Sequence, residues 1–425
     1  MSLKVLLIGS GGREHAMAWK IAQSPNLEEL IIAPGNAGTA GLGENVSIAA
    51  DDIGALLEFA RVRSVDLTVV GPEQPLIDGL VDLFKAAGLL AFGPSAAAAR
   101  IEGSKVWSYE LMCKYGIPTA KSVAFTDSES AIKYGHSRPE GSLVVKADGP
   151  AAGKGVILPD SYDDLDMAIR YMLDGGAFGK SSSKILLVER MNGPEVSVFA
   201  FVQGEIVSSE VAACDYKRID EGDIGPNTGG VGSYTPPEFW SPNLAGQIRT
   251  DILEPTVKAL VAENSSYSGV LYAGIMITDS GPRVVEFNCR FGDPECQIIM
   301  PKLQTDLLEI CLAVADGGLA HQEIKWAETA HTFVVLSSNG YPGNYETGHV
   351  INGVEAAADH GLVMHAGTAR DVSGSLVTSG GRVLGVVGSG GSIKESRESA
   401  YAGVELISFE GVQYRRDIAA RAIKN

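Results

Sequence analysis

A glycine-rich segment flanked by lysines has the residue types that bind phosphate. Residues 142–146 form an apolar run that ends in Lys146, and a second apolar run follows at residues 156–158. The segment between them contains Lys154, Gly149, Gly153 and Gly155. A Walker loop places Gly-Lys-Ser/Thr at the start of a helix, whereas this pattern predicts a hairpin of two strands. Such a loop can fold over triphosphate oxygens, and the alternative for Lys146 is a solvated charge at a strand end.

Two oxygen-bearing side chains in a later hairpin suit a metal ion. Residues 270–277 and 283–288 are strand-like and are joined by a Ser-Gly turn. Because side chains alternate along a strand, Glu286 and Asn288 fall on one face, roughly 7 Å apart at Cα. They can hold Mg²⁺, which keeps waters and takes phosphate oxygens as its other ligands. Arg290 follows and is placed to bind an anion bidentately, whereas the alternative for this segment is a polar edge strand.

A third candidate segment follows the strand-like residues 184–189. This strand ends in Glu189 and leads into a loop that contains Met191 and Glu195. Backbone groups of a segment that leaves a strand can pair with the edge of an adenine. Glu189 and Glu195 could then accept the adenine amino group and the ribose hydroxyls. Two glutamates in a loop are a common pattern, so this hypothesis depends on the neighbouring motifs.

The elements that position these groups begin with alternating strands and helices in the first hundred residues. Strand-like runs occur at residues 4–8, 30–32, 67–70 and 89–92, and helical periodicity occurs at 15–21, 56–63 and 76–87. Such alternation predicts a doubly wound parallel sheet, which binds ligands at the carboxyl ends of its strands. Each strand runs into a turn that contains glycine or proline, so the loop chemistry gathers at one edge.

The first of these turns, residues 9–14, is similar to a dinucleotide-binding loop but lacks two of its features. Glu14 occupies the position of the third glycine, and residues 33–36 contain no acid for a ribose hydroxyl. What remains is a helix N-terminus whose N–H groups suit a single phosphate. The alternative is a structural turn of an ordinary α/β domain.

Composition restricts the class of protein. The 425 residues carry 34 basic and 52 acidic side chains, a net charge of −18, which disfavours a nucleic-acid partner. Five cysteines without a Cys-x-x-Cys pair argue against a disulfide framework or structural zinc. No apolar run reaches the roughly 18 residues of a membrane span, so we expect a cytoplasmic protein with no membrane partner. The 51 glycines predict many tight turns and loops that approach ligands closely.

These motifs together resemble the ATP-grasp superfamily and, within it, the phosphoribosylamine–glycine ligase (glycinamide ribonucleotide synthetase) family. The likeness extends from residue 4 to about residue 420. It rests on eight strings in order, at residues 11–15, 33–39, 70–73, 102–105, 146–148, 151–155, 225–230 and 286–295. Each string is a modest signal, but chance does not produce eight of them in one order.

The resemblance implies an α/β and α+β multidomain chain. The expected units are an N-terminal doubly wound parallel α/β domain for phosphoribosylamine (1–103), a linker and small ATP-grasp subdomain with the glycine loop (104–192), a large ATP-grasp subdomain with the metal strand (193–328) and a small C-terminal α/β cap (329–425). The cap shows helical periodicity near residues 393–402 but no recognisable chemistry. Its scattered histidines are expected to be structural.

The resemblance also implies a reaction of purine biosynthesis. ATP phosphorylates the carboxylate of glycine, and the amine of 5-phosphoribosylamine then displaces phosphate from the glycyl phosphate. Lys105 and Lys146 would bind the ATP phosphates, while the glycine loop with Lys154 would close over them. Glu286 and Asn288 would hold Mg²⁺ or Mn²⁺. The residues expected around the rest of the nucleotide are Glu189, Met191 and Glu195.

The resemblance places the two other substrates by analogy. Arg290 would stabilise the glycine carboxylate and the acyl phosphate, Asp293 would order the Arg290 loop, and Asp215 would bind the glycine ammonium. The predicted phosphoribosyl site comprises Gly11, Gly12, Asn36, Gly38, Thr39 and Glu73. Three positions depart from the family pattern: Pro150, Cys296 and the pair Ala273-Gly274, where many ATP-grasp relatives carry another metal carboxylate.

Three alternative functions stay open at this point. One is another ATP-grasp carboxylate–amine ligase or carboxylase with the same ATP site. Another is a dinucleotide-dependent oxidoreductase, which the missing acid after residue 32 disfavours. The third is a non-catalytic ATP-binding protein, which the intact Lys146 and Glu286 disfavour. We expect a monomer, with a dimer as the alternative.

Overall fold

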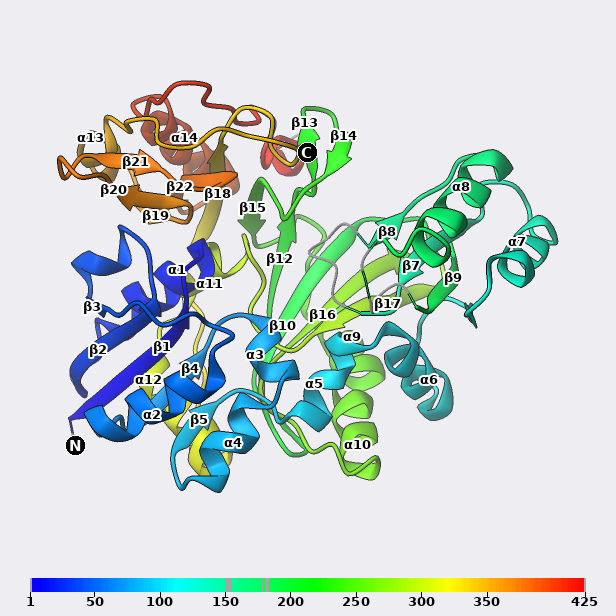
Figure 1. Ribbon diagram of the computed structural model, residues 1–425, viewed down its shortest axis with the longest axis horizontal. Coiled ribbons are helices and arrows are strands. Elements are labelled where there is room, and N and C mark those ends of the chain that lie inside the picture. The colour runs from blue at the N-terminus through cyan, green and yellow to red at the C-terminus, as the bar shows by residue number, and fades with distance from the viewer. Residues whose placement is uncertain (1, 150–154, 178, 180–182, 424–425) are drawn as a thin grey trace.

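The N-terminal unit is built on a parallel five-stranded sheet (Figure 1). The computed structural model describes residues 2–149, 155–177, 179 and 183–423. The sheet has the order β3-β2-β1-β4-β5, and all of its neighbouring strands run parallel. Its strands are β1 (Leu3–Gly9), β2 (Leu27–Pro34), β3 (Glu44–Asn45), β4 (Leu67–Val70) and β5 (Leu90–Phe92).

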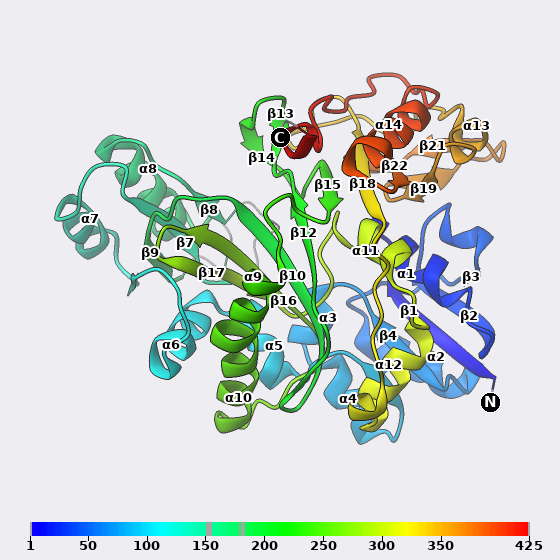
Figure 2. The same ribbon diagram turned by 180° about the vertical axis from the view of Figure 1, so that it is seen from behind.

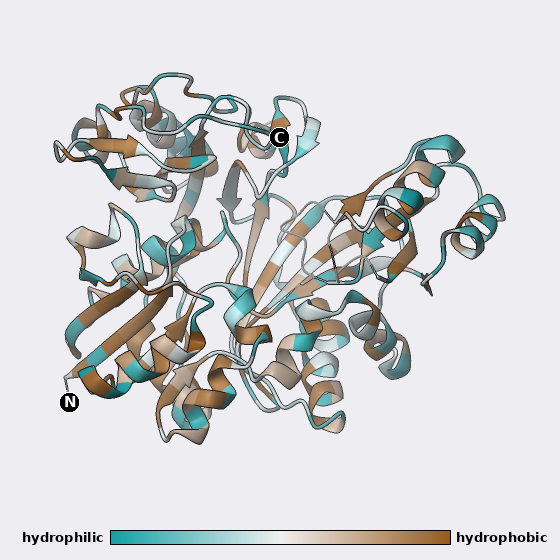
Figure 3. Ribbon diagram, viewed as in Figure 1, coloured by the Kyte–Doolittle hydropathy of each residue, from teal (hydrophilic) through white to brown (hydrophobic). Residues whose placement is uncertain are grey.

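Helices flank this sheet, as the alternating pattern predicted. They are α1 (Gly12–Ile21), α2 (Ile53–Arg63), α3 (Glu73–Ile77), α4 (Leu80–Ala86) and α5 (Ala96–Gly103), with the 3-10 turn η1 (Thr39–Gly41). The single helix predicted at residues 76–87 is wrong, because Gly79 adopts a φ of +87° and divides that segment into α3 and α4. The strands are strongly hydrophobic in Figure 3, as expected for a parallel sheet covered on both faces.

The middle unit is a four-stranded antiparallel sheet that extends to one side of the molecule (Figures 1 and 2). Its order is β6-β9-β7-β8, and the antiparallel pair β7–β8 confirms the predicted hairpin. Ala131, Leu165 and Ile169 of the covering helices pack against Val145 and Leu187. The elements are β6 (Ser122–Phe125), β7 (Leu143–Ala147), β8 (Val156–Ile157), β9 (Ile185–Glu189), α6 (Lys105–Tyr115), α7 (Ser128–His136) and α8 (Tyr162–Leu173).

The central sheet runs without interruption into the C-terminal unit. Its strand order is β17-β16-β10-β12-β15-β18-β22-β19, with β11 paired to β10. The antiparallel pair β15–β18 carries the sheet across the predicted boundary between residues 328 and 329. The strands are β10 (Glu195–Gln203), β11 (Ile206–Val207), β12 (Val211–Asp215), β15 (Gly232–Thr235), β16 (Ser268–Thr278), β17 (Gly281–Asn288), β18 (Ala330–Ser337), β19 (Leu362–His365) and β22 (Arg382–Gly390).

Helices and two small ribbons complete these units. The ribbons are β13 (Arg218–Asp220) with β14 (Ile224–Asn227), and β20 (Thr368–Arg370) with β21 (Leu376–Thr378). The helices are α9 (Pro242–Ile248), η3 (Arg249–Leu253), α10 (Glu254–Ala262), α11 (Cys296–Lys302), α12 (Leu307–Asp316), η4 (Leu319–His321), α13 (Val354–Ala358), α14 (Ile393–Val404) and η5 (Ala420–Ile423). Helix α14 confirms the periodicity seen near residues 393–402. None of the helices within the described ranges combines the length and apolar character needed to cross a bilayer.

Candidate active site

The two predicted phosphate-binding lysines lie between the middle unit and the central sheet. The Lys146 ammonium is buried and donates to the Val285 carbonyl at 3.0 Å and to the Tyr109 hydroxyl at 3.3 Å. The Lys105 ammonium donates to the Gly149 carbonyl at 3.2 Å. Burial lowers the pKa of Lys105, Glu286 opposes this effect, and Lys146 lowers the pKa further. The two ammonium groups therefore lie close enough to each other and to Glu286 for their charges to interact.

Two of the sequence motifs position each other at the start of α6. The Asp148 carboxylate accepts hydrogen bonds from the Ser104 hydroxyl at 2.9 Å and from the Val106 N–H at 2.8 Å. The Lys105 N–H donates to the Asp148 carbonyl at 2.9 Å. These bonds satisfy N–H groups that helix geometry leaves without partners. The lysine on α6 is thus fixed relative to the loop that follows Lys146.

Glu286 carries the negative charge around which the lysines gather. Burial alone would raise its pKa, but Lys217, Lys146 and Lys105 outweigh burial and hold the pKa below its ordinary value. Within the described residues, neither the Glu286 carboxylate nor the Asn288 amide makes a direct hydrogen bond or ion pair. Both side chains keep their oxygens available, which is the donor chemistry that Mg²⁺ or Mn²⁺ requires. No cluster of three or more acidic, His or Cys side chains suited to a metal occurs in the described part of the chain.

The residues expected around the nucleotide are only partly brought together. Gly153 and Lys154 lie outside the described residues, whereas the Gly155 carbonyl accepts from the Ala147 N–H and closes the hairpin. Glu189 ends β9, where its N–H donates to the Lys121 carbonyl at 2.8 Å, and Met191 packs on the core beyond it. Glu195 differs from the prediction, because it begins β10 and pairs with Lys217.

Strand register places several polar side chains on one face of the central sheet. Glu286 lies opposite Gly274, Gly274 opposite Ser197, and Ser197 opposite Ala213. Directly paired residues of a sheet share a face, and so do residues two positions apart. Glu195 and Asp215 therefore lie on the same face as Glu286. Three carboxylates from three strands therefore gather on this face, which forms the floor of the candidate site.

Asp215 is an enclosed carboxylate on this floor. Burial raises its pKa to about 7, although Lys217 lowers the pKa, and Glu295 and Glu195 contribute to the rise. Glu295 is also buried and has a raised pKa, and its carboxylate accepts from the Ser197 hydroxyl at 2.9 Å. Asp215 and Glu295 are therefore two neighbouring carboxyls whose pKa burial raises, on the same face of the sheet as Glu286 in the case of Asp215.

Lys217 is a charged residue of the site that the sequence analysis missed. Its ammonium forms an ion pair with the Glu195 carboxylate. Burial would lower the pKa of Lys217, but Glu195, Asp215 and Glu286 outweigh burial and hold it well above the ordinary value. The spacing Asp215-x-Lys217 at the end of a strand was the available sequence signal for this lysine. Its other carboxylate partners, Glu195 and Glu286, lie on other strands, so one sequence does not reveal them.

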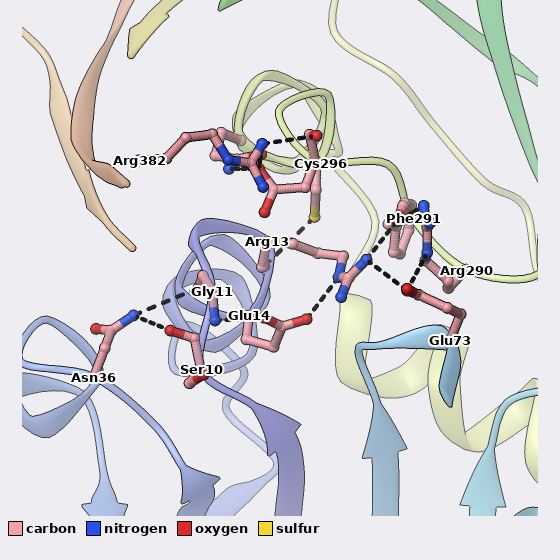
Figure 4. Close-up of polar contacts among 12 residues, drawn as sticks. Ser10, Gly11, Arg13, Glu14, Asn36, Glu73, Arg290, Phe291, Cys296 and Arg382 are labelled. Atoms are coloured by element: carbon pink, nitrogen blue, oxygen red, sulfur yellow. Dashed lines mark hydrogen bonds and ion pairs between the residues drawn. The ribbon is translucent and has the colours of Figure 1, made fainter. Parts of the chain in front are cut away.

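Arg290 is less free than the sequence suggested (Figure 4). Its guanidinium donates to Glu73 at 3.1 Å, a contact drawn in Figure 4. It also donates to Glu102 at 2.7 Å and to the Phe291 carbonyl at 3.2 Å. Glu102 also accepts from the Cys289 N–H at 2.7 Å. A guanidinium has five N–H groups, so two remain for a ligand after these three bonds. These bonds connect the segment after β17 to Glu73 of α3 and Glu102 of α5, both in the N-terminal unit.

Glu73 is placed with Arg290 rather than with the other predicted phosphoribosyl residues. Burial would raise its pKa, but Arg290 and Arg13 outweigh burial and lower the pKa to about 2. Arg13 in turn donates to Glu14 at 2.6 Å. Glu14 accepts from the Gly11 N–H at 2.6 Å, so a side chain rather than a free anion caps this N–H of α1. Figure 4 shows these charges as one chain of contacts between the two units.

A cavity of about 330 Å³ lies between the N-terminal and C-terminal units. Of the six residues predicted for the phosphoribosyl group, Gly11, Gly12 and Asn36 line this cavity, whereas Gly38, Thr39 and Glu73 are not among its lining residues. Thr39 is fully buried and accepts a hydrogen bond from the Asn36 N–H at 2.8 Å, so it stabilises the Asn36 loop without facing the cavity. The remaining lining residues are Ser10, Gly35, Asp293, Ala366, Gly367, Thr368, Ser379 and Arg382.

Arg382 supplies the positive charge of this cavity and was also missed. Its Nη1 donates to the Gly229 carbonyl at 2.7 Å, and to the backbone and side chain of Asp293 at 3.0 and 3.1 Å. Within the described residues, its Nε and Nη2 donate to no protein group. Arg382 and Arg13 hold the pKa of Asp293 below its ordinary value against the effect of burial. Asp293 therefore orders Arg382, and the prediction that it orders the Arg290 loop has no direct contact to support it.

Comparisons with known proteins identify the family of the chain. The family model described as phosphoribosylglycinamide synthetase, N domain, matches residues 3–102. The models for its ATP-grasp (A) domain and its C domain match residues 103–296 and 331–421. A phosphoribosylamine–glycine ligase of Pasteurella multocida is 45% identical, with 99% of this chain and 98% of the relative covered. One from Escherichia coli O6:H1 is 47% identical, with 99% of each chain covered.

Solved structures give the same relationship. A crystal structure of phosphoribosylamine–glycine ligase from Thermotoga maritima matches with a TM-score of 0.86 and 33% identity, covering 98% of this chain and all of that one. The biotin carboxylase domain of Hydrogenobacter thermophilus 2-oxoglutarate carboxylase, solved with MgADP and bicarbonate, matches with a TM-score of 0.73. Its identity is 14% over 97% of this chain and 92% of that one, so it shares the fold. The chain belongs to the phosphoribosylglycinamide synthetase family of ATP-grasp ligases.

Proposed function

We propose that this protein ligates glycine to 5-phosphoribosylamine with ATP, giving 5-phosphoribosylglycinamide, ADP and phosphate in purine biosynthesis. The observation that carries the proposal is the gathering of Lys105, Lys146 and Lys217 around Glu286 in a chain of net charge −18. An acidic protein that transfers a phosphoryl group must concentrate positive charge at the phosphates. The family relationship specifies which carboxylate and which amine react.

The first step is phosphoryl transfer to glycine. A carboxylate oxygen of glycine forms a bond to the γ-phosphorus, and the bond from that phosphorus to the ADP oxygen breaks. Protein catalysis of such a transfer is mainly positioning and charge neutralisation. Lys105 and Lys146 bind the phosphate oxygens, and Gly149 and Gly155 lie at the two ends of the glycine loop next to them. Glu286 and Asn288 would hold Mg²⁺ or Mn²⁺, which would supply neutralisation of the phosphate charge.

The nucleotide and the glycine lie on opposite sides of the reacting phosphoryl group in this proposal. Glu189 and Met191 receive the adenosine at the end of β9. Asp215 binds the ammonium group of glycine from the floor of the central sheet. Arg290 adds positive charge near the glycine carboxylate through the two N–H groups that Glu73, Glu102 and the Phe291 carbonyl leave free.

The second step joins the amine to the activated glycine. The nitrogen of 5-phosphoribosylamine attacks the carbonyl carbon, the bond to the phosphate oxygen breaks, and the nitrogen releases a proton. The phosphoribosyl group occupies the cavity between the N-terminal and C-terminal units, where Gly11, Gly12 and Asn36 form one wall. Arg382 forms the other wall, and its unused Nε and Nη2 suit a phosphate. Water must be excluded because an acyl phosphate hydrolyses readily.

An assay of ADP formation tests the function. ADP should form only when ATP, glycine and 5-phosphoribosylamine are all present. ADP formation with bicarbonate in place of glycine would instead support a carboxylase, and indifference to 5-phosphoribosylamine would support a different carboxylate–amine ligase. Sedimentation of the free protein tests the expected monomer against a dimer.

A further inference from the structure

Two cations lie near the place expected for the glycine carboxylate, and their surroundings differ. Arg290 is held by two carboxylates, and only 16% of its side-chain surface is exposed. Lys217 is held by Glu195 alone, and 37% of its side-chain surface is exposed. An ammonium has three N–H donors, and within the described residues only Glu195 accepts from Lys217. Lys217 is therefore the cation with more capacity for a new anionic partner.

We propose that Lys217 is a catalytic residue that binds the reacting carboxylate of glycine and then the acyl phosphate formed from it. The inference deepens the proposed function and rests on it, since it requires a carboxylate substrate. While the carboxylate oxygen bonds to the γ-phosphorus and ADP leaves, the ammonium stays paired with the second carboxylate oxygen. Glu195 is then a positioning residue, because it holds the ammonium over the sheet.

The sheet register supports this placement. Lys217 follows β12 by two residues, and Asp215 ends that strand on the same face as Glu195 and Glu286. The residues between these carboxylates are small: Ser197, Ala213 and Gly274. A Cβ built on Gly274 would already lie 3.4 Å from the Glu286 Cγ. The paired positions that connect Glu195, Asp215 and Glu286 across the sheet are therefore occupied by small, buried residues, so no large side chain separates the three carboxylates there.

The local charge gives a second, independent argument. Three carboxylates, Glu195, Asp215 and Glu286, face this floor, so an entering carboxylate would be repelled unless a cation met it. Lys105 and Lys146 lie on the side of the ATP phosphates, where Lys146 is already bonded to Val285 and Tyr109. Lys217 follows β12 and pairs with Glu195 of β10, two strands that lie beyond β16 from the β17 strand of Glu286. It is the cation that completes a site for a zwitterion, with Asp215 as its counterpart for the ammonium.

The test compares Lys217→Met with Lys217→Arg and with Lys258→Met, a control at an exposed lysine of α10. For Lys217→Met we expect kcat/KM for glycine to fall by about 100-fold or more, with the dissociation constant of ATP within a few-fold of the wild type. Lys217→Arg keeps the charge and should recover part of the loss. Lys258→Met should match the wild type. Thermal midpoints show whether each variant folds.

A fourth variant covers the case in which Lys217→Met does not fold. Glu195→Gln keeps the Lys217 charge and removes its anchor, so it should raise the KM for glycine about 10-fold while ATP affinity persists. If Lys217→Met folds and uses glycine with wild-type kinetics, the inference is overturned. If Lys217→Met does not fold, wild-type kinetics for glycine in both Lys217→Arg and Glu195→Gln would overturn it. An equal loss of ATP binding and glycine use would also overturn it. Absence of glycine-dependent ADP formation by the wild type would contradict the proposed function itself.

Discussion

The phosphoryl-transfer site and the cavity between the N-terminal and C-terminal units are built differently. The first takes Glu195, Asp215 and Glu286 from one face of one sheet, and Lys146 from a neighbouring hairpin. The second joins residues far apart in the chain: Asn36 donates to the carbonyl of His365, 329 positions later. Arg382 reaches that cavity from the first residue of β22.

This difference in construction should make the two sites respond differently to substitution. The groups on the sheet are fixed by strand pairing, so their mutual positions do not depend on how the units dock. The cavity exists only where two units meet, so its affinity depends on their contact. We therefore expect variants of the first site to change kcat or glycine use, and variants of the second to change mainly the KM for 5-phosphoribosylamine.

The largest effect is expected at Glu286, which belongs to the sheet-based site and has no counterpart in the cavity. Glu286→Ala removes the proposed metal ligand and the charge that interacts with three lysines, so kcat should fall by about 100- to 1,000-fold. Steady-state ADP formation measures this loss, and Glu58→Ala, at an exposed residue of α2, is the matched control. Near-normal turnover of a folded Glu286→Ala protein would show that the phosphoryl site lies elsewhere.

A smaller and more selective effect is expected at Arg382. Arg382→Ala should raise the KM for 5-phosphoribosylamine by about 10- to 100-fold, because each hydrogen bond to a charged group contributes about 1.5–3 kcal/mol. The KM values for ATP and glycine should stay within a few-fold, as all three should in Arg370→Ala, an exposed arginine of β20. Equal increases in all three KM values for Arg382→Ala would mean that the cavity is not a separate site.

The smallest effect concerns the pH dependence of glycine binding. Asp215 is enclosed with Lys217, Glu195 and Glu295, and burial raises its pKa to about 7. Because the ionised form binds an ammonium, the KM for glycine should fall several-fold as the pH rises through about 7. Asp215→Asn should remove this dependence. A KM profile that is the same in wild type and Asp215→Asn would contradict the assignment.

The same pKa has a consequence for stability. A raised pKa means that the folded state holds the proton more tightly than the unfolded state, whose carboxyl titrates near 3.8. The contribution of Asp215 to the free energy of unfolding should therefore decrease as the pH rises from about 4 to about 7. Denaturant unfolding of the wild type and of Asp215→Asn measures this difference.

The sequence predicted the parts of the site that local patterns encode. The sequence placed Lys146 near the end of an apolar strand and Glu286 and Asn288 two positions apart on one strand, as β7 and β17 confirm, whereas the ligands of these residues stay a prediction. Lys217 was missed because its partner Glu195 lies on another strand, and pairing between strands is not visible in one sequence. Arg382 was missed because its cavity is formed by a distant loop. Arg290 was recognised, but its bonds to Glu73 and Glu102 depend on how the units pack.

ADP release with each substrate omitted in turn tests the central claim most directly. The account predicts that the wild type forms ADP, phosphate and 5-phosphoribosylglycinamide in equal amounts only when ATP, glycine and 5-phosphoribosylamine are all supplied. Sustained ADP formation that does not require glycine, or a complete mixture that yields no glycinamide product, would contradict it.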